Sequence, residues 1–513
     1  MRKRKSKEKI KLHPVMALLV LSVIVIILSG ILSLFNVHAN FSQISTKTGE
    51  YQATTEAVTS LLNLSGLKYI FTSTVSNFAN LAVLPHLIII LLGIGVMRKS
   101  GFIRTLVTEL TKKVKKTTVT FVLVFTCIIA SIIGDLSYII FIPISAMLFR
   151  YGKRNPNIGV IAAFAALSCG TGISILLTST DSSLLSTTLL NVHVLQSNYT
   201  ISPYAFWFIM LFATVAISLI ITNITENIIA KNLPKYEIEE DNNEDLEFTK
   251  EKKRGLLLAG IAGFIYLIIF LYNIIPGLPL SGKLLDNSQS LYIDKLFSYD
   301  SFFSNGFIFI VTVFFIILGL AYGIGAKTIK NNKDFVESLG FSLDRIGQVL
   351  VMIFATATFI SIFKQTNIGN VITITLANWL GNTNFSGLPL IILLFIISGI
   401  ITIFLPGTIN KWSILAATTI PKLMYNGISP EFAQVVFRFG ESITMGITPI
   451  LAYFIVYVAY LEKYSGNNKT ISLSQAIKYQ IPYSVMAMGV YLIIIIIWYL
   501  IGLPLGAGAR VAL

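Results

Sequence analysis

Long, almost uncharged apolar runs recur along this chain and limit its fold more than any other feature of the sequence. Several approach or exceed the roughly 20 residues that cross the apolar core of a bilayer as a helix. Only 12% of the 513 residues are charged and 54% are hydrophobic, whereas soluble domains carry about 25% charged residues. Apolar and polar residues do not alternate over strand lengths, which argues against a membrane β-barrel. The sequence therefore predicts an all-α polytopic membrane protein.

The positive charge of the chain, formally +15, is unevenly distributed. Lys and Arg cluster at 2–5, 98–116, 150–154 and 250–254. Each cluster borders an apolar run, as the positive-inside rule describes for cytoplasmic flanks. This placement indicates contact with a lipid bilayer and argues against nucleic acid as a partner. We expect a multi-pass protein of the inner or plasma membrane with its N-terminus in the cytoplasm.

Residue types that carry catalysis or bind metals are sparse. Both cysteines, Cys127 and Cys169, lie in apolar segments without metal-ligand spacing. The four histidines are scattered along the chain. A phosphate-binding loop of the type G-x-x-x-x-G-K-S/T is also absent, so ATP is not the expected energy source. We therefore expect no enzyme and no metal-ligand cluster, with an intramembrane enzyme or a channel as the less favoured alternatives.

The first half of the chain contains two apolar stretches that are too long for one untilted helix. An N-terminal helix and an outer interfacial segment occupy 1–81, and a first repeat follows at 82–226. Within it, 117–149 has basic clusters at both ends and Gly134-Asp135 in the middle, which predicts a re-entrant hairpin from the cytoplasm. The stretch 158–196 is interrupted by glycines and hydroxyl residues, which predicts a broken crossing helix.

The second half shows the same order of elements. An acidic cytoplasmic linker at 227–255 and connecting helices at 256–346 lead to a second repeat at 347–513. Its over-long stretch 389–424 has uncharged flanks, which favours a hairpin entered from outside, and 430–461 is the second broken helix. About nine transmembrane helices and two re-entrant hairpins then form an inverted-topology repeat, an architecture of many secondary transporters.

Five blocks of the sequence resemble the AbgT family of p-aminobenzoyl-glutamate transporters, in an order and spacing that agree along nearly the whole chain. The blocks are Asp135 to Pro143, Thr180-Asp181, FKQTNIG at 363–369, Lys411-Trp412, and RFGESITMGITP at 438–449. The resemblance implies the same two hairpins and nine crossings, a homodimer with scaffold and transport parts, and an ion gradient as the energy source. It implies uptake of p-aminobenzoyl-glutamate or efflux of sulfonamide drugs.

The chain departs from the family pattern at four positions. Glu441 stands where the family usually has Asp, and Met445 stands where it usually has Asn. Ser174 replaces the usual Asn near the first helix break, and Ile409 replaces the usual Ser of the second hairpin, next to Asn410. These positions belong to the expected ion and substrate sites, so the chain is identified as a divergent member of the family.

The candidate binding residues are polar groups placed within apolar stretches. A charge at the centre of a bilayer costs roughly 2.5–3.5 kcal/mol or more, which favours a functional role for Asp181, beside Thr180 and Ser174. Asp135 at the first hairpin tip either caps a half-helix or lines a cavity. A sodium site near Asp135, Asp181 and Asn410 is one expectation.

The second repeat supplies the remaining candidates. Arg438 and Glu441 are three residues apart, so they face the same side of a helix and can form an internal ion pair. Alternatively, the planar guanidinium of Arg438 binds a substrate carboxylate. Trp412 either stacks on an aromatic substrate or anchors the chain in the interface. Further candidates are Thr444, and Asn367 at an expected break before the second hairpin.

These observations predict a secondary transporter of a small aromatic or amide-linked carboxylate such as p-aminobenzoyl-glutamate. A coupling cation, sodium or proton, is expected in place of a cofactor. The alternatives within transporters are efflux of drugs or metabolites and uptake of another small carboxylate. The expected partners are the anionic substrate, the bilayer and a second copy of the chain.

Overall fold

The computed structural model describes residues 12–44, 51–175, 178–234, 248–344, 346–466 and 470–513. Within these residues it contains nine helical stretches that are long and apolar enough to cross a membrane. The nine are Pro14–Leu34, Leu64–Lys99, Lys116–Ile133, Trp207–Asn232, Lys250–Ile274, Phe302–Gly325, Ile346–Gln365, Gly387–Phe404 and Leu473–Ile501. This number equals the nine crossings predicted from the sequence, although the nine helical stretches are not the same segments as the nine predicted crossings. The structure's nine include the first arm of each hairpin, whereas each half of a broken helix is too short to be counted.

The N-terminal region contains a two-stranded ribbon that the sequence analysis did not anticipate. After α1 (Pro14–Leu34), strands β1 (His38–Ile44) and β2 (Tyr51–Ala57) pair antiparallel. Helix α2 (Leu64–Ala79) follows, and Asn63 caps its first turn through a hydrogen bond from the Gly66 amide. The segment expected to lie in the interface is therefore a ribbon followed by a helix.

The first repeat contains the hairpin and the broken helix at the expected positions. Its helices are α3 (Val83–Lys99), α4 (Phe102–Lys113), α5 (Lys116–Ile129), α6 (Leu136–Tyr151), α7 (Pro156–Cys169), α8 (Ser179–His193) and α9 (Trp207–Ile224). A short 3-10 turn, Ala130–Ile133, leads into the hairpin tip. The short amphipathic helix α4 was not predicted.

The linker expected at 227–255 is shorter than predicted. Helix α9 continues through a π-helical turn, Thr225–Ile229, into α10 (Ala230–Asn232), and α11 (Lys250–Ile274) begins inside the expected linker. Most of the acidic run lies outside the described residues. The connecting helices are α11, α12 (Tyr292–Phe297), α13 (Phe302–Gly325) and α14 (Asn332–Gly340). Asp286 precedes α12, and its carboxylate accepts hydrogen bonds from the hydroxyls of Ser298 and Ser288, which hold the pKa of this carboxyl well below its usual range.

The second repeat has the same order of elements as the first. Its helices are α15 (Ile346–Gln365), α16 (Ile368–Asn382), α17 (Gly387–Phe404), α18 (Thr408–Tyr425), α19 (Pro430–Ser442), α20 (Phe454–Lys463) and α21 (Leu473–Ile501). Helix α16, which was not predicted, corresponds in order to α4. Each repeat thus contains a helix, a shorter helix, a hairpin, a broken helix and a final helix.

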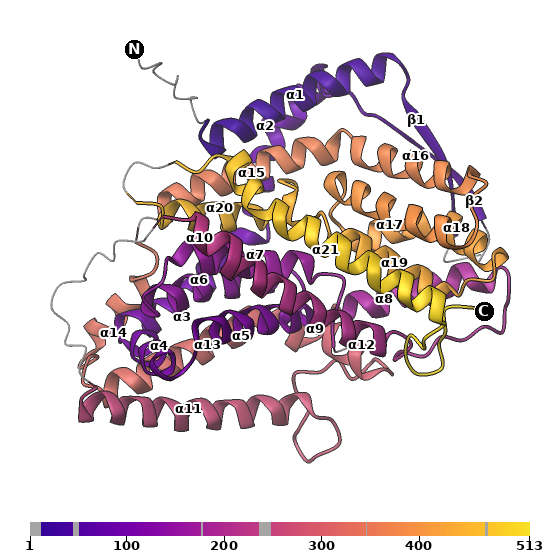
Figure 1. The fold of residues 1–513 in the computed structure, drawn as a ribbon. Coiled ribbons are helices and arrows are strands. Elements are labelled where there is room, and N and C mark those ends of the chain that lie inside the picture. The colour runs from indigo at the N-terminus through magenta and orange to yellow at the C-terminus, as the bar shows by residue number, and fades with distance from the viewer. Residues whose placement is uncertain (1–11, 45–50, 176–177, 235–247, 345, 467–469) are drawn as a thin grey trace, which may run out of the picture.

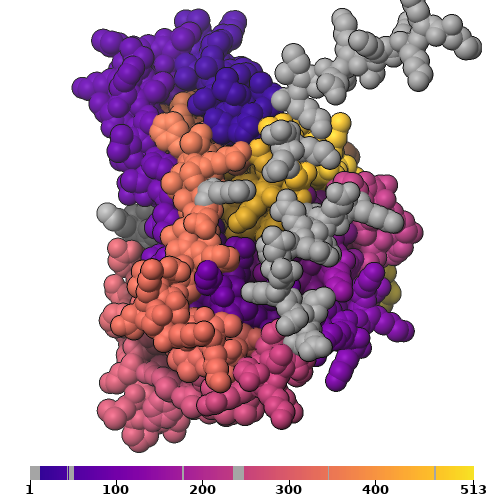
Figure 2. All heavy atoms as spheres, turned by 90° about the vertical axis from the view of Figure 1, so that its left-hand side faces the viewer, coloured from indigo at the N-terminus to yellow at the C-terminus, as the bar shows by residue number. Residues whose placement is uncertain are grey.

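The two hairpins open toward opposite ends of the molecule. The chain leaves the first hairpin, at the end of α6, beside α4 and near α10. There Asn155 donates a hydrogen bond to the Pro234 carbonyl. The chain that leaves the second hairpin, after α18, is hydrogen-bonded to the C-terminal segment, because Ser429 donates to the Arg510 carbonyl. In Figure 1, α4 and α10 lie on one side of the molecule, and the C-terminus lies on the other with the ribbon. Figure 2 views the molecule from the α4 side, with α1 at one edge and α11 at the other.

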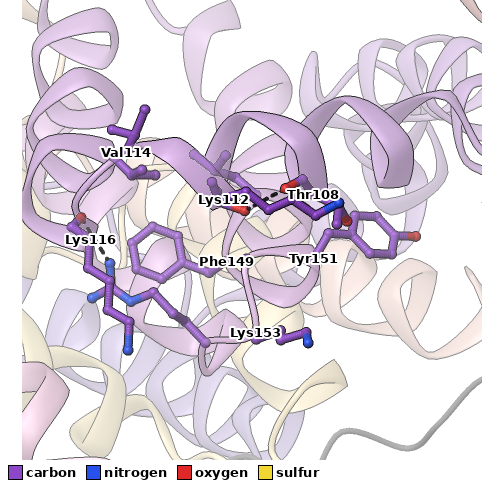
Figure 3. A pocket seen from close by; sticks show the side chains of 12 residues that line it. Thr108, Lys112, Val114, Lys116, Phe149, Tyr151 and Lys153 are labelled. Carbon is purple, nitrogen blue, oxygen red and sulfur yellow. Dashed lines mark hydrogen bonds between the residues drawn. The ribbon is translucent and has the colours of Figure 1, made fainter. Parts of the chain in front are cut away.

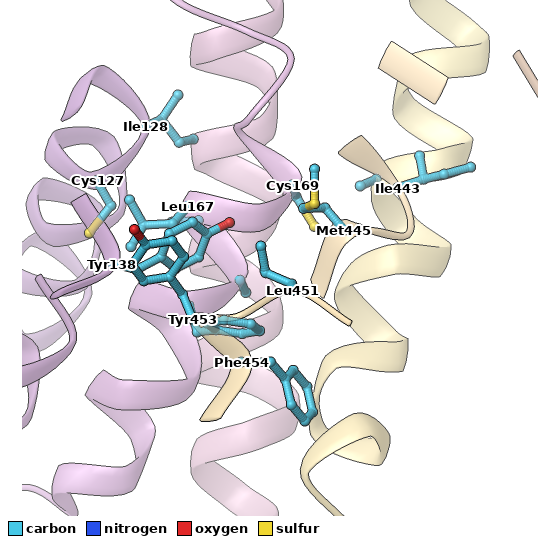
Figure 4. Close-up of a cluster of buried hydrophobic side chains, with 14 of the residues drawn as sticks. Cys127, Ile128, Tyr138, Leu167, Cys169, Ile443, Met445, Leu451, Tyr453 and Phe454 are labelled. Carbon is cyan, nitrogen blue, oxygen red and sulfur yellow. The ribbon is translucent and has the colours of Figure 1, made fainter. Parts of the chain in front are cut away.

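The hairpins and broken helices form the core between these edges. Helix α6 packs on α7 and α20, and α18 packs on α8 and α19, so each hairpin contacts broken helices of both repeats. Figure 4 shows one part of this core, where Tyr138 of the first hairpin stacks on Tyr453 beyond the second break, at 5.6 Å between ring centroids. Met445 and Cys169 lie in the same cluster, one from each break (Figure 4).

Candidate functional site

The first break lies between α7 and α8, and its own side chains define where α8 begins. The Thr178 hydroxyl accepts a hydrogen bond from the Asp181 amide at 3.0 Å, and the Asp181 carboxylate accepts one from the Thr178 amide at 3.2 Å. This reciprocal capping box satisfies two backbone donors that the start of a helix leaves free. Asp181 is therefore fixed at the N-terminal turn of a half-helix in the middle of the protein.

The second break touches the first through a glycine. The Gly172 amide donates to the Ser442 hydroxyl at 2.7 Å. A Cβ atom on Gly172 would lie 2.0 Å from the Arg438 carbonyl oxygen, which no real side chain could tolerate. The close approach of these two backbones therefore requires glycine. It brings the segment directly after α7 and the last turns of α19 together.

Four charged side chains meet where the breaks join the second hairpin, and they alternate in sign. Nη1 of Arg438 donates to Oε1 of Glu441 at 2.5 Å, so the expected ion pair within α19 is confirmed. Nζ of Lys411, on α18, lies 2.9 Å from Oε2 of Glu441. Nε of Arg438 lies 3.5 Å from Oδ1 of Asp181. We call these residues, Asp181, Lys411, Arg438 and Glu441, the four-charge cluster.

The charges of the cluster are buried and balance to zero. Lys411 and Glu441 are fully buried, and Arg438 is 4% exposed. Such burial is tolerated only when every charge is paired and hydrogen-bonded, because desolvation costs several kcal/mol per ion. Lys411 also donates to Thr402 at 2.7 Å, and Nη2 of Arg438 donates to the Thr171 carbonyl at 2.7 Å.

Asp181 is the most exposed member of the cluster, and it forms the longest of the cluster's ion pairs. The Asp181 side chain is 12% exposed, whereas that of Glu441 is fully buried. At 3.5 Å from Asp181, Nε of Arg438 has no hydrogen-bond partner within the described part of the chain. The guanidinium therefore retains one free donor toward Asp181. A carboxylate is the group that fits such a donor best.

Trp412 lies next to the cluster in a polar contact between helices. It is fully buried, its indole N–H donates to the Thr188 hydroxyl at 2.9 Å, and its ring packs on Phe437 at 4.7 Å between centroids. The Thr188 hydroxyl in turn donates to Gln434 at 2.7 Å. Trp412 therefore sits between α8 and α19, so interfacial anchoring does not describe it, and Phe437 occupies one stacking position.

The hairpin tips approach the breaks through hydrogen bonds to the backbone. Ser131, near the first tip, donates to the Ile173 carbonyl at 3.1 Å, and Thr444 donates to the Gly399 carbonyl of α17 at 2.6 Å. Asp135 and Asn410 occupy the two tips, and both are exposed. Asp135 precedes α6 without a side-chain capping bond, so the capping role considered for it is not observed.

The structure brings some of the predicted residues together and separates others. Ser174 is buried in the first break, and Thr180 is partly buried in the first turn of α8. Asn367 lies elsewhere, because its amide donates to Glu56 at 2.5 Å and to the Ala57 carbonyl of the ribbon. Its backbone is left-handed, with φ of 60°, where it precedes α16. Asn367 therefore joins α16 to the ribbon and not to the cluster.

The sodium site expected near Asp135, Asp181 and Asn410 stays a prediction. Within the described ranges, no group of three or more His, Cys, Asp or Glu side chains is placed to hold a metal ion. Asp181 is engaged by Thr178 and Arg438, while the other two residues stand at separate hairpin tips. Of these three residues, Asp181 is the one that belongs to the four-charge cluster.

Lys411 is the functional candidate that the sequence analysis did not select. It lies within an over-long apolar stretch, directly after the expected break of the second hairpin. The cost of an intramembrane charge, which singled out Asp181, applies equally to Lys411. Thr188 and Gln434, which form the polar contact at Trp412, carry no such signal, because hydroxyl and amide groups are common in membrane helices.

A separate cavity lies away from the cluster. It has a volume of about 370 Å³ at the open end of the first hairpin, between α4, the first turn of α5 and the last turn of α6 (Figure 3). Its lining includes Lys112, Lys116, Lys153 and Arg154. In the four-charge cluster, by comparison, Lys411 and Glu441 are fully buried and the Asp181 side chain is 12% exposed.

Comparison with known proteins gives matches along nearly the whole chain. The family model described as the AbgT putative transporter family matches residues 8–513. The p-aminobenzoyl-glutamate transport protein of Escherichia coli strain K12 is 26% identical over 497 residues, which cover 97% of this chain and 94% of that protein.

Two solved structures were also matched. The YdaH transporter of Alcanivorax borkumensis is 24% identical, with a TM-score of 0.48, over 96% of this chain and 100% of that chain. MtrF of Neisseria gonorrhoeae, described with a class of antimetabolite efflux pumps, is 28% identical, with a TM-score of 0.49, over 98% of each chain.

Proposed function

Since this chain belongs to the AbgT family of transporters, we propose that it moves a small aromatic or amide-linked carboxylate across the membrane, driven by a cation gradient. Its family and its curated relative are transporters and not enzymes. The relative from Escherichia coli is named for p-aminobenzoyl-glutamate, and we propose this compound as the first substrate to test. The chain is a multi-pass membrane protein, and we place it in the inner or plasma membrane with its N-terminus in the cytoplasm.

The observation that carries this proposal is the position of Arg438. Its guanidinium is buried where two broken helices and a hairpin meet, and its Nε lacks a hydrogen-bond partner among the described residues. A planar guanidinium binds a carboxylate through paired hydrogen bonds, which gives both affinity and orientation. The substrate carboxylate would approach from the side of Asp181, where the cluster is most open.

The charge balance of the cluster supports coupling to a cation. Two acidic and two basic side chains sum to zero, so an added carboxylate leaves one uncompensated negative charge. Buried charge of this kind is costly unless a proton or cation arrives with it. Asp181 is the more exposed acid and the more weakly paired one, so we propose that a proton or cation neutralises Asp181 and releases Arg438 for the substrate.

The arrangement of the repeats supports transport by alternating access. The two hairpins open toward opposite ends of the molecule, and each packs on broken helices of both repeats. We propose that the repeats, 82–226 and 347–513, have inverted topology and rock against the remaining helices. We also propose that those helices hold the contact between two copies of the chain in a homodimer.

The test measures labelled p-aminobenzoyl-glutamate in proteoliposomes, with sodium and proton gradients imposed separately and in both directions. Saturable accumulation that depends on one gradient supports the proposal, and the direction of the effective gradient distinguishes uptake from efflux. Asp181→Asn is expected to abolish accumulation against a gradient and to retain exchange of labelled for unlabelled substrate. Asp300→Asn, in the loop before α13, serves as the matched control. Absence of accumulation under every gradient would reject this substrate.

A further inference from the structure

The cavity at the open end of the first hairpin has a strongly basic lining. Twelve residues line it, of which four are basic and none is acidic. They come from three elements: α4, the first turn of α5, and the last turn of α6 with the loop that follows (Figure 3). A cavity with this lining is distinct from the four-charge cluster, and the transport mechanism proposed above does not use it.

Two of the four basic side chains are already neutralised by acidic partners. Nζ of Lys112 lies 2.5 Å from Glu109, one turn earlier in α4. Nη2 of Arg154 donates to Glu226 at 2.7 Å, and its guanidinium lies over the Phe149 ring, 4.3 Å from the centroid. These contacts hold two side chains of the cavity wall in place. The net positive charge of the cavity therefore comes from the other two basic residues.

Lys116 and Lys153 supply an uncompensated charge of two. Neither ammonium group lies within 4 Å of an acidic group in the described part of the chain, and both side chains are exposed at the cavity. Lys116 is also the first residue of α5, whose initial amides have no side-chain cap. The positive end of that helix adds to the attraction for an anion.

The backbone at Lys153 is held in an uncommon conformation. Its φ is 56°, in the left-handed region that side chains other than Gly, Asn and Asp seldom adopt. Hydrogen bonds from the Lys153 and Arg154 amides to Arg150 and Phe149 carbonyls keep the turn closed. The lysine is therefore presented at a fixed place beside the first turn of α5.

Apolar side chains line the cavity beside its charges, and exposed valines lie next to it. Val119 and Leu148 line it beside the charges. Val114 at its rim is 39% exposed, and Val122, one turn deeper on α5, is 54% exposed. Helix α5 begins a candidate membrane span at Lys116, so the cavity lies at the level where headgroups meet acyl chains. An occupant at this place needs an anionic head and an apolar body.

We propose that this cavity binds the phosphate headgroup of an anionic phospholipid, with Lys116 and Lys153 as its charge partners. Basic pockets between membrane helices are a known means of holding such headgroups. The lipid would join α4 to both arms of the first hairpin at its open end. Its binding therefore stabilises the hairpin against α4 without contact to the four-charge cluster.

The experiment titrates full-length, delipidated protein in detergent with dioleoylphosphatidylglycerol and follows lipid binding by native mass spectrometry. The test variant combines Lys116→Gln with Lys153→Asn, because asparagine tolerates the left-handed backbone. The matched control combines Lys113→Gln with Lys333→Gln, which removes two exposed lysines outside the cavity. We expect the test variant to bind this lipid at least about tenfold more weakly, since each lysine near a membrane surface contributes about fivefold. The control is expected to bind within about twofold of the parent.

Three outcomes would overturn the proposal. The first is equal binding of the lipid by the test variant and the control, and the second is binding of phosphatidylcholine to the parent as tight as that of phosphatidylglycerol. The third is displacement of the lipid by inorganic phosphate at millimolar concentration, which would assign the cavity to a soluble anion. If the double variant unfolds at a lower temperature in lipid-free detergent, Lys116→Gln alone is measured, with about a fivefold loss expected.

Discussion

The first hairpin, α5–α6, and the second, α17–α18, occupy corresponding places in the two repeats, yet their polar groups lie at different positions along their arms. The first exposes Asp135 at its tip and presents lysines at its open end. The second buries Lys411 and Trp412 in the first turns of its returning arm. At its open end, Lys422 donates hydrogen bonds to backbone carbonyls in the last turn of α16.

This difference shows that a repeated fold does not imply a repeated site. The second hairpin supplies one of the four buried charges, so its position is tied to the stability of the core. The first hairpin contacts the first break through the Ser131 hydroxyl, which donates to the Ile173 carbonyl, and through apolar packing, without a buried charge among its described residues. We therefore expect substitutions in the second hairpin to reduce stability and transport together, and those at the first tip to leave stability unchanged.

The largest effect is expected from Lys411→Met. This change leaves the Glu441 carboxylate buried without the cation that lies 2.9 Å from it. Breaking one partner of a buried ion pair costs about 3–5 kcal/mol. We expect a large fall in the unfolding temperature of the purified protein, measured by its intrinsic fluorescence, together with loss of uptake.

A second variant separates the lost charge pair from simple loss of volume. Lys411→Met combined with Glu441→Gln removes both charges, so we expect it to regain at least half of the lost stability. Transport is expected to remain absent, because Arg438 has lost the Glu441 carboxylate that orients its guanidinium. Equal instability of the single and double variants would show that packing of Lys411, and not its charge, stabilises the second hairpin.

Gly172→Ala is expected to have the next largest effect. The new methyl group would lie 2.0 Å from the Arg438 carbonyl oxygen, so the two breaks must move apart. Overpacking of this kind costs about 1–3 kcal/mol, and the displacement acts directly on the cluster. We expect uptake to fall at least tenfold, with a smaller loss of stability than in Lys411→Met. The control is Gly260→Ala on α11, where an added methyl group would meet no atom within 4 Å.

The sequence predicted the long-range plan of the fold because length and charge are strong signals in membrane proteins. Basic clusters on both sides of 117–149 and uncharged flanks around 389–424 predicted two hairpins with opposite entries. The short helices α4 and α16 were missed because neither is long enough to cross a bilayer. The ribbon β1–β2 was missed because its strands carry mixed polar residues, and β2 has no buried face that would set an alternation.

The candidate site was predicted in part, for the same physical reason. Asp181, Arg438 and Glu441 were found because charged groups are costly within apolar stretches. That Lys411 completes the cluster depends on packing of α18 against α8 and α19, which no local pattern encodes. Asn367 lies at the ribbon and away from the cluster. The sequence did not predict this contact, because a helix break does not indicate which other element its side chains will contact.

A smaller effect is expected from Trp412→Phe, which tests how the second hairpin is held against α8. The change removes the hydrogen bond to Thr188 and leaves part of the indole volume empty. Each loss is worth about 1 kcal/mol. We expect a modest decrease in the unfolding temperature and uptake reduced by less than tenfold. Trp379→Phe, at a half-exposed position on α16, is the control and should behave like the parent.

The smallest effect on stability is expected from Asp135→Asn at the first hairpin tip. Its carboxylate is exposed and caps no helix, so the change in the free energy of unfolding should stay within about 0.5 kcal/mol. Gradient-driven uptake should also fall less than it does in Asp181→Asn, because Asp135 belongs to no ion pair among the described residues. A loss of stability comparable to that of Lys411→Met would mean that the first tip is packed as tightly as the second. The two hairpins would then share one structural role, and the asymmetry drawn from their buried charges would not hold.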